Sequence, residues 1–393
     1  SGYRAAISNL GRLVMDLGQS YSLSVLPLFI LMGLLVEKGG MAKQLYRAAY
    51  AFLGDKKGGL AMSTVVACGM FSAISGSSIA TAATMSKVAM PEMRRYKYAD
   101  SLATASIAAG GTLGILIPPS VILVIYGLLT EQSIGKLFMA GFIPGFIGIL
   151  FYTLAVKFVV TRDASLGPAG ERTDWKERLV ALRDVWTTLA LFIFVIGGIY
   201  IGLFSATEAA GMGAAGALLI TFLKGVLTRK MLMEVGREAA LLTAKLFALL
   251  FGASMFSNFL NRAGLPDALM GVINSFELSG IAVIFIILLI YVLLGCVFES
   301  MSMILLTVPI FAPLVHQLGF DLIWFGILVV VVTEISLITP PIGLNVFVLK
   351  GVIKDVSVST IFKGVTPFWF ADIIRLILLT SIPALSLFLP SLM

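Results

Sequence analysis

The stretch Cys68-Gly-Met-Phe-Ser-Ala-Ile-Ser-Gly-Ser-Ser-Ile-Ala-Thr81 places glycines and small hydroxyl residues inside apolar sequence, and Gly110-Gly-Thr-Leu-Gly-Ile-Leu-Ile-Pro-Pro119 does the same downstream. Opened backbone in hydrocarbon is tolerated only where it is buried in protein or lines a cavity. The pattern returns in Gly295-Cys-Val-Phe-Glu-Ser-Met-Ser302 and in Thr333-Glu-Ile-Ser-Leu-Ile-Thr-Pro-Pro341. Paired interruptions in two halves of a membrane protein indicate the midplane binding site of a transporter.

The composition supports a membrane protein. Of 393 residues, 59% are hydrophobic and only 12% are charged, whereas a soluble protein has roughly 25% charged residues. The alternating segments of a β-barrel are absent, so we expect an all-α polytopic membrane protein. The net charge of +7 fits loops on one membrane side better than nucleic-acid binding. Both cysteines lie in apolar sequence, and we expect free thiols.

Further anchors show that the chain contains a long internal repeat. Lys38-Gly-Gly-Met41 corresponds to Arg262-Ala-Gly-Leu265, an offset of 224 residues, and the pair at Pro118 corresponds to the pair at Pro340, an offset of 222. Glu131 and Asp355 begin a third matching pair of segments. Ordered anchors at nearly one spacing predict two structural repeats.

The basic residues predict that the two repeats have opposite orientation. Segment 54–59 has two lysines and its partner 276–280 has none, whereas 350–363 has three lysines and its partner 130–136 has one. Lys and Arg accumulate in cytoplasmic loops. We therefore expect inverted-topology repeats, each with a re-entrant helical hairpin and a broken transmembrane helix.

One arrangement of elements fits these patterns. It places the cytoplasmic linker at 161–184 and ends the first scaffold segment at 57. The expected elements are interfacial segments at 41–53 and 265–277, hairpins at 59–92 and 280–315, broken helices at 98–129 and 321–349, and further helices at 22–36, 137–160, 185–204, 209–223, 239–260 and 364–390.

Small oxygen-bearing residues at the hairpin turns and helix breaks are candidate ligands of a hard cation such as sodium, because half-helix C-termini and hydroxyls suit such an ion. The alternative is a structural role, in which the hydroxyls donate to nearby helix carbonyls and the glycines allow close packing. The first candidate site comprises Ser75, Ser77, Ser78, Thr81, Gly110, Gly111, Thr112 and Gly114. The second comprises Gly295, Cys296, Glu299, Ser300, Thr333, Ser336 and Thr339.

Glu299 and Glu334 are carboxylates within apolar segments, and such residues are costly and usually functional. They could neutralise a cation, relay a proton or remain protonated donors, or they could simply bond to hairpin backbone. The first repeat has no carboxylate at the matching places. Asn345 could hold substrate or cap local backbone.

One enzyme hypothesis remains open, because Ser75–Ser78 and the sole histidine, His316, could form an intramembrane serine protease. A nucleophilic serine needs a base within hydrogen-bond reach. The expected topology places His316 in an outside loop and the serines at the midplane. Nucleotide-binding and metal-ligand motifs are absent from the sequence.

With these residues in view, the chain resembles the large membrane subunit of tripartite ATP-independent periplasmic (TRAP) transporters, a DctM/SiaM-like permease. The resemblance covers essentially the whole chain. It is carried by Phe71-Ser-Ala-Ile-Ser-Gly-Ser-Ser-Ile-Ala-Thr81, Gly111-Thr-Leu-Gly-Ile-Leu-Ile-Pro-Pro-Ser120, Ser133-Ile-Gly-Lys-Leu-Phe-Met-Ala-Gly-Phe-Ile-Pro-Gly145 and Thr339-Pro-Pro-Ile-Gly-Leu-Asn345. The family usually has one more helix before 22–36, so we expect an upstream segment.

The resemblance implies an elevator, in which a transport domain slides against a scaffold. It implies sodium coupling, import of an organic acid such as sialic acid or a C4-dicarboxylate, and the bacterial inner membrane. Its partners would be a small four-helix membrane subunit and a periplasmic substrate-binding protein. The substrate would contact Ser75, Gly76, Ser77, Pro119, Ser300, Pro341 and Asn345.

The same resemblance implies a division of the chain. The transport domain would comprise 58–130 and 280–350. The scaffold and arms would comprise 20–57, 131–264, 265–279 and 351–393. The alternative to a tripartite system is a stand-alone sodium- or proton-coupled carboxylate symporter.

Overall fold

The computed structural model describes residues 2–393, except for the side chains of residues 2–10, Ile74, Asn261 and Pro266. The described chain is helical throughout and contains no strand, with eighteen α-helices joined by short turns. Six helices are long and apolar enough to cross a membrane. They are Tyr21–Lys38, Ile134–Arg162, Trp175–Tyr200, Ala206–Leu223, Arg229–Leu260 and Ser300–Gln317.

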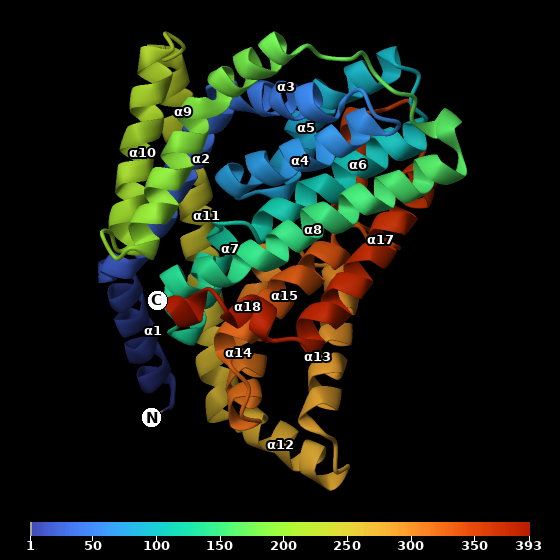
Figure 1. Ribbon diagram of the computed structural model, residues 1–393. Coiled ribbons are helices and arrows are strands. Elements are labelled where there is room, and N and C mark those ends of the chain that lie inside the picture. The colour runs from blue at the N-terminus through green and yellow to red at the C-terminus, as the bar shows by residue number, and fades with distance from the viewer. Residues whose placement is uncertain (1) are drawn as a thin grey trace.

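The same order of elements occurs twice. The first repeat runs through α3 (Met41–Leu53), α4 (Gly59–Ser75), α5 (Ser78–Arg95), α6 (Asp100–Thr112), α7 (Val121–Thr130) and α8 (Ile134–Arg162). The second repeat runs through α12 (Leu265–Ser275), α13 (Gly280–Gly295), α14 (Ser300–Gln317), α15 (Leu322–Ser336), α16 (Leu344–Val352) and α17 (Val358–Ser381). Figure 1 places α3 at one end of the molecule and α12 at the opposite end. In each repeat two helices form a hairpin, α4 with α5 and α13 with α14, and the next helix is interrupted, between α6 and α7 and between α15 and α16.

Helix starts recur at matching positions of the two repeats. Ser77 caps α5 and Glu299 caps α14, each by accepting backbone N–H groups of the first turn. Ser133 caps α8 and Ser357 caps α17 in the same way. A side-chain oxygen at this position satisfies N–H groups that have no partner within the helix.

The two repeats pack against each other in a crossed manner. The returning helix of the first hairpin, α5, packs against α16, which follows the break of the second repeat. The returning helix of the second hairpin, α14, packs against α7, which follows the break of the first repeat. Each hairpin therefore completes the surroundings of the other repeat's broken helix. The first helix break is largely buried, whereas the second exposes Pro340 and Pro341.

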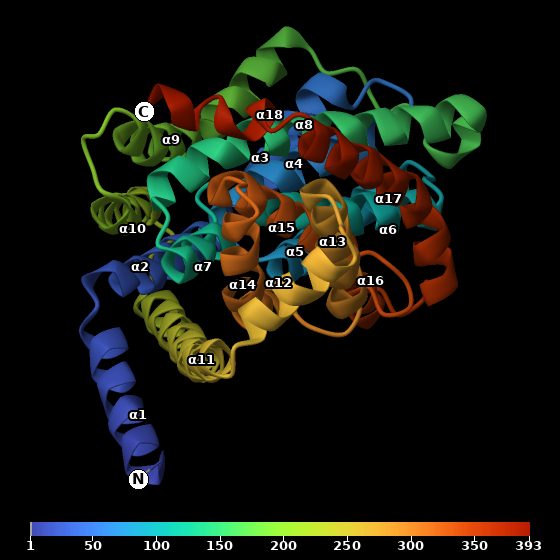
Figure 2. The same ribbon diagram turned by 90° about the horizontal axis from the view of Figure 1, so that it is seen from below.

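The remaining helices form a second layer beside this core. The helices α2 (Val25–Lys38), α9 (Trp175–Tyr200), α10 (Ala206–Leu223) and α11 (Arg229–Arg262) pack in sequence, α9 on α10, α10 on α2 and α2 on α11. In Figure 2, α1 (Gly2–Gln19) projects away from the other helices. The last α-helix, α18 (Ala384–Leu387), packs on α8 and is followed by a 3-10 turn at Pro390–Leu392.

Three predicted boundaries were wrong. The helix expected at 364–390 ends earlier, because α17 stops at Ser381 and Pro383 precedes α18. The other two concern charged segments. The linker expected at 161–184 ends earlier, because α9 begins at Trp175 with Asp174 as its cap. The helix expected at 239–260 begins at Arg229. In both cases charged residues continue the helix beyond its apolar part, where hydropathy alone gives no helical signal.

Candidate functional site

The first hairpin turns within three residues. Gly76 ends α4 with a φ of 64°, a left-handed conformation that favours glycine. Ser77 then caps α5 by accepting the N–H of Ala80 at 3.2 Å. The hydroxyls of Ser75 and Thr81 lie 2.9 Å apart across the turn. The turn thus gathers uncharged oxygens beside the C-terminus of α4 and the N-terminus of α5.

The first helix break lies against this turn. After α6 the chain forms a short 3-10 turn at 113–115 and a cis peptide bond at Pro118-Pro119 before α7. A Cβ on Gly111 would lie 3.3 Å from the Ser78 carbonyl oxygen, and one on Gly114 would lie 1.9 Å from Ser72 Oγ. These two glycines therefore allow the broken helix to contact the hairpin directly.

A buried polar junction joins three elements from both repeats. Asn345 Nδ2, on α16, donates to Ser78 Oγ at 2.7 Å and to the Ala108 carbonyl of α6 at 3.0 Å. Ser78 Oγ lies 2.9 Å from Asn345 Oδ1. Asn345 is fully buried and Ser78 is 5% exposed. Asn345, predicted to hold substrate or cap local backbone, bonds across the two repeats, and its contact with substrate stays a prediction.

The second hairpin carries a charge at its turn. Glu299 accepts the N–H groups of Met301 at 3.0 Å and Ser302 at 3.3 Å. The preceding residues Val297 and Phe298 are exposed, whereas Ser300 is buried. The carboxylate therefore bonds hairpin backbone, which is the structural alternative among its predicted roles, and it leaves one oxygen without a bond to the hairpin.

The second break also lies close to its hairpin. A Cβ on Gly295 would lie 2.0 Å from Ser336 Oγ, and Cys296 Sγ lies 3.5 Å from the carbonyl of Pro340. Thr333, Ser336 and Thr339 each donate to a carbonyl of the preceding turn. Thr339 also accepts from Trp369 Nε1 at 3.0 Å.

The structure thus places the predicted residues in two groups, one at each hairpin. Three of them lie outside these groups. Thr112 points away from the hairpin, 3.3 Å from the Tyr152 hydroxyl of α8. Pro119 lines a small apolar cavity with residues of α2 and α9. Pro341 is exposed. Both cysteines are free.

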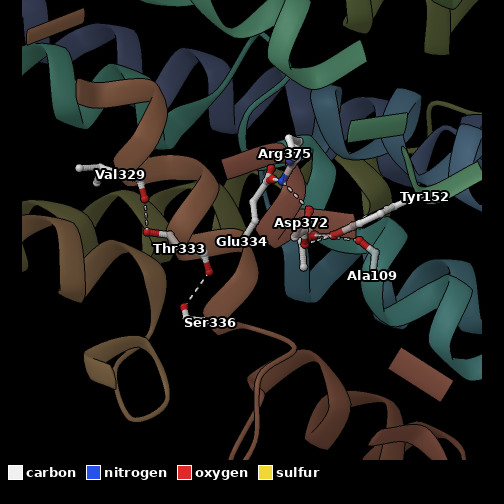
Figure 3. A network of polar contacts seen from close by, with 9 residues as sticks. Ala109, Tyr152, Val329, Thr333, Glu334, Ser336, Asp372 and Arg375 are labelled. Carbon is white, nitrogen blue, oxygen red and sulfur yellow. Dashed lines mark hydrogen bonds and ion pairs between the residues drawn. The ribbon is translucent and has the colours of Figure 1, made fainter. Parts of the chain in front are cut away.

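A buried ionic network was missed from the sequence (Figure 3). Arg375 of α17 is fully buried, pairs with Glu334 of α15, and lies 2.9 Å from Asp372 Oδ1. Asp372 accepts from the Tyr152 hydroxyl at 2.5 Å. Glu334 therefore belongs to this network rather than to the second break. The spacing of Asp372 and Arg375 within an apolar helix is the signal that could have indicated it.

Two further arrangements bear on the chemistry of the site. The described side chains include no group of three His, Cys, Asp and Glu able to hold a metal. His316 lines a cavity with residues of α7, α11 and α14, none of which belongs to Ser75–Ser78. What the hairpin turns offer is neutral oxygens, helix ends and one carboxylate, a donor set that fits an alkali cation.

The fold is that of multi-pass membrane transporters. It matches the YdaH transporter of Alcanivorax borkumensis with a TM-score of 0.69 and 14% identity, covering 98% of this chain and 89% of that chain. It matches MtrF of Neisseria gonorrhoeae, described in connection with antimetabolite efflux pumps, with a TM-score of 0.65 and 14% identity over 96% and 84%. Such low identity shows the fold alone.

The sequence is more specific. The profile described as "Tripartite ATP-independent periplasmic transporter, DctM component" matches residues 7–385, and the chain belongs to this family. It is 34% identical to the C4-dicarboxylate TRAP transporter large permease protein DctM of Pseudomonas aeruginosa, over 98% of this chain and 90% of the relative. It is 33% identical to the ectoine permease TeaC of Halomonas elongata, over 94% and 86%, and 30% identical to the sialic acid permease SiaM of Vibrio cholerae, over 95% and 87%.

Proposed function

We propose that this chain is the large permease of a TRAP system that imports an organic acid with sodium across the bacterial inner membrane. The observation that carries the proposal is the buried junction of Ser78, Asn345 and the Ala108 carbonyl. It ties the first hairpin to the broken helices of both repeats at the centre of the fold. Relatives named for C4-dicarboxylate, ectoine and sialic acid transport support the substrate class.

The two hairpins have different roles in this proposal. The N–H groups at the start of α14 are already bonded by the Glu299 carboxylate. The start of α5 is capped only by the neutral hydroxyl of Ser77. An anionic group is favoured at a helix N-terminus that carries no acid. We therefore assign the substrate carboxylate to the first turn, with Gly76, Ser77 and Asn345 nearest.

Sodium would be held at both hairpins, by Ser75, Ser78 and Thr81 with the backbone at Gly111 and Gly114, and by the backbone around Gly295 with Glu299 and the second break. The hydroxyls of Ser75 and Thr81 already face one another at 2.9 Å. Hydroxyl and carbonyl oxygens are the ligands that hard cations prefer at unwound helices.

The buried network refines which helices would move in an elevator. Arg375 of α17 and Glu334 of α15 are both fully buried, so sliding one past the other would separate an ion pair inside the protein. Breaking such a pair costs about 3–5 kcal/mol. We therefore propose that α8 and α17 travel with the hairpins, in addition to 58–130 and 280–350.

A cross-link tests this refinement. A Cβ on Gly69 of α4 would lie 3.1 Å from Ile149 Cγ1 of α8, so Gly69→Cys with Ile149→Cys should form a disulfide once Cys68 and Cys296 are replaced by alanine. We expect the oxidised protein to retain uptake, as the reduced protein does. Loss of uptake on oxidation, restored by reduction, would show that α8 stays behind while the hairpin moves.

Uptake by proteoliposomes tests the function itself. The chain would be reconstituted with its small membrane subunit and given labelled acids, with and without a cognate periplasmic binding protein, under sodium or proton gradients. We expect uptake to require both sodium and the binding protein. Uptake on sodium alone would indicate a stand-alone symporter, and uptake indifferent to sodium would contradict the cation sites.

A matched pair of variants tests whether transport depends on the junction between Ser78 and Asn345. Asn345→Ala removes two bonds between repeats, and Ser63→Ala removes a buried hydroxyl of α4 that bonds only its own helix, to the Gly59 carbonyl. We expect Asn345→Ala to lower uptake at least tenfold and Ser63→Ala to lower it less than twofold. Equal uptake by both variants would separate the junction from transport.

A further inference from the structure

A cavity between α3 and α5 is not used by the proposed transport site. It has a volume of about 390 Å³ and opens at the end of the molecule where α3 lies (Figure 1). Its lining contains Lys43 and Arg47 of α3 and Lys87 of α5, together with one acid, Glu92. Cationic side chains from two different helices therefore converge on one concave surface.

The basic groups around this cavity are only partly paired within the protein. Glu92 already lies 3.8 Å from Arg95, and Arg47 pairs with Asp184 at 3.3 Å. Among the described residues, Lys43 and Lys87 form no ion pair, and both are exposed. Lys87 interacts electrostatically with Glu37 of α2, but neither lysine forms a close ion pair with a described residue, and two such groups on facing helices offer a site for an external anion.

The rest of the lining is apolar. The aromatic residues Tyr46 and Tyr50, together with Val88 and Pro91, supply the carbon surface of the cavity wall. A small inorganic anion would gain nothing from such a wall, whereas an amphiphile with an anionic head would bury its glycerol and upper chain carbons there. The lysine stems can cover the same apolar surface while their charges stay in water.

The position of the cavity also favours a lipid. The helix α3 buries Leu45, Tyr46 and Ala49 and exposes Lys43 and Arg47, so it has one apolar and one basic face. The apolar face packs within the protein against α4 and α9, so α3 presents its basic face outward, and basic groups at a membrane surface attract anionic lipids of the cytoplasmic leaflet. We propose that this cavity is a binding site for the phosphate headgroup of an anionic phospholipid, held by Lys43 and Lys87.

The site has a mechanical consequence that does not depend on which acid is transported. It bridges α3, the segment that precedes the first hairpin, and α5, the returning helix of that hairpin. A bound headgroup would tie these two helices together through its contacts with Lys43 on one side and Lys87 on the other.

Lipid binding by the full chain in detergent tests the proposal. Phosphatidylglycerol, phosphatidylcholine and inorganic phosphate would each be titrated, and bound lipid would be counted by native mass spectrometry. We expect Lys43→Gln with Lys87→Gln to weaken phosphatidylglycerol binding about thirtyfold, since each basic residue near a membrane surface contributes about a factor of five. The single variants should fall between, and Lys43→Arg with Lys87→Arg should bind like the native chain.

The matched control is Lys56→Gln with Lys57→Gln, which changes the net charge equally at exposed lysines outside the cavity. We expect it to weaken binding less than threefold. Equal weakening in both double variants would show only general surface attraction and would overturn the site. Competition by millimolar phosphate, or equal binding of phosphatidylcholine, would also contradict an anionic-lipid site. If the double variant does not fold, phosphatidylglycerol binding is compared in Lys43→Gln and Lys87→Gln, and unchanged binding in both would overturn the site.

Discussion

The two repeats build the same contacts from different residues. Thr112 of the first repeat and Glu334 of the second each lie six residues before the first proline of a Pro-Pro pair. Thr112 contacts Tyr152 of α8, and Glu334 contacts Arg375 of α17, the corresponding helix. A neutral hydroxyl pair in one repeat is therefore an ion pair in the other.

The helix caps follow the same rule. The neutral Ser77 starts α5, and the acidic Glu299 starts α14. The close contact between hairpin and break is also conserved in shape but reversed in residues. In the first repeat Ser72 is on the hairpin and Gly114 on the break, whereas in the second Gly295 is on the hairpin and Ser336 on the break. The two repeats thus share the geometry of their hairpin and break contacts, but only the second places charged residues at these contacts.

The largest expected effect comes from the ion pair. Arg375→Met leaves Glu334 and Asp372 buried without a cation, and removal of one partner from a buried pair costs about 3–5 kcal/mol. Thermal unfolding in detergent measures the loss. The first-repeat counterpart, Tyr152→Phe, removes one hydroxyl bonded to a carboxylate and should cost about 1.5–3 kcal/mol.

Two controls accompany this comparison. Lys245→Met removes a cation from the exposed side of α11 and should change stability by less than about 0.5 kcal/mol. Adding Glu334→Gln and Asp372→Asn to Arg375→Met should restore part of the lost stability. If Arg375→Met were as stable as Lys245→Met, the ion pair of the second repeat would not contribute to stability.

The glycine contacts provide the next test. Gly114→Ala would put a Cβ 2.2 Å from the backbone carbon of Ser72, whereas Gly295→Ala meets mainly the Ser336 side chain. We expect both to destabilise by about 1–3 kcal/mol, with Gly114→Ala at the upper end. Ser336→Gly should rescue Gly295→Ala, but Ser72→Gly should not rescue Gly114→Ala, because its clash includes backbone.

Thermal unfolding of the four variants checks this prediction, with Gly252→Ala in α11 as the control because nothing lies within 4 Å of its Cβ position. That control should be neutral or slightly stabilising. Equal rescue in both repeats would mean that the two contacts adapt alike, and the reversal of Ser and Gly would then be incidental.

These contacts also show how far the sequence could be read. The glycine and proline interruptions, repeated at one offset, predicted the hairpins and broken helices, because such residues stand out in apolar sequence. The partners across the fold could not be predicted in the same way. Asn345 bonds Ser78 over a separation of 267 residues, and nothing local to either residue specifies that contact.

The sequence did not predict the ionic network, for a different reason. Asp372 and Arg375 are three residues apart on one helix face, and such spacing indicates an ion pair within a single helix. Only the fold shows that Glu334 and Tyr152 join it from two other helices. Thr333, Ser336 and Thr339 were predicted as cation ligands from their composition; their hydroxyls donate to carbonyls of the preceding turn, and the cation site stays a prediction.

The helix caps test whether the charge of the second repeat serves structure or transport. Glu299→Ser keeps a capping oxygen and removes the carboxylate, so we expect a loss of less than about 1 kcal/mol. Ser77→Ala removes the cap and should cost about 1 kcal/mol. If Glu299 neutralises sodium, Glu299→Ser lowers sodium-driven uptake by tenfold or more while leaving thermal stability nearly unchanged. Unchanged uptake would assign Glu299 to capping alone.

The smallest effect concerns an exposed ion pair between the repeats. Arg94 of α5 lies 2.6 Å from Asp355 in the loop before α17, and its hydrogen bond lowers the pKa of Asp355. The matching residue Glu131 forms no ion pair among the described residues. A carboxylate with a lowered pKa stabilises the fold above its unfolded pKa of about 3.9, and this contribution is lost as the pH falls through the folded pKa.

We therefore expect Asp355→Asn to lower the thermal midpoint slightly at pH 7 and pH 5, and to have a smaller effect at pH 3. Glu131→Gln should have no effect at any of these pH values. High salt should reduce the Asp355→Asn difference, because surface pairs are screened. A difference for Asp355→Asn that does not shrink between pH 5 and pH 3 would mean that the side chain contributes by packing rather than by charge.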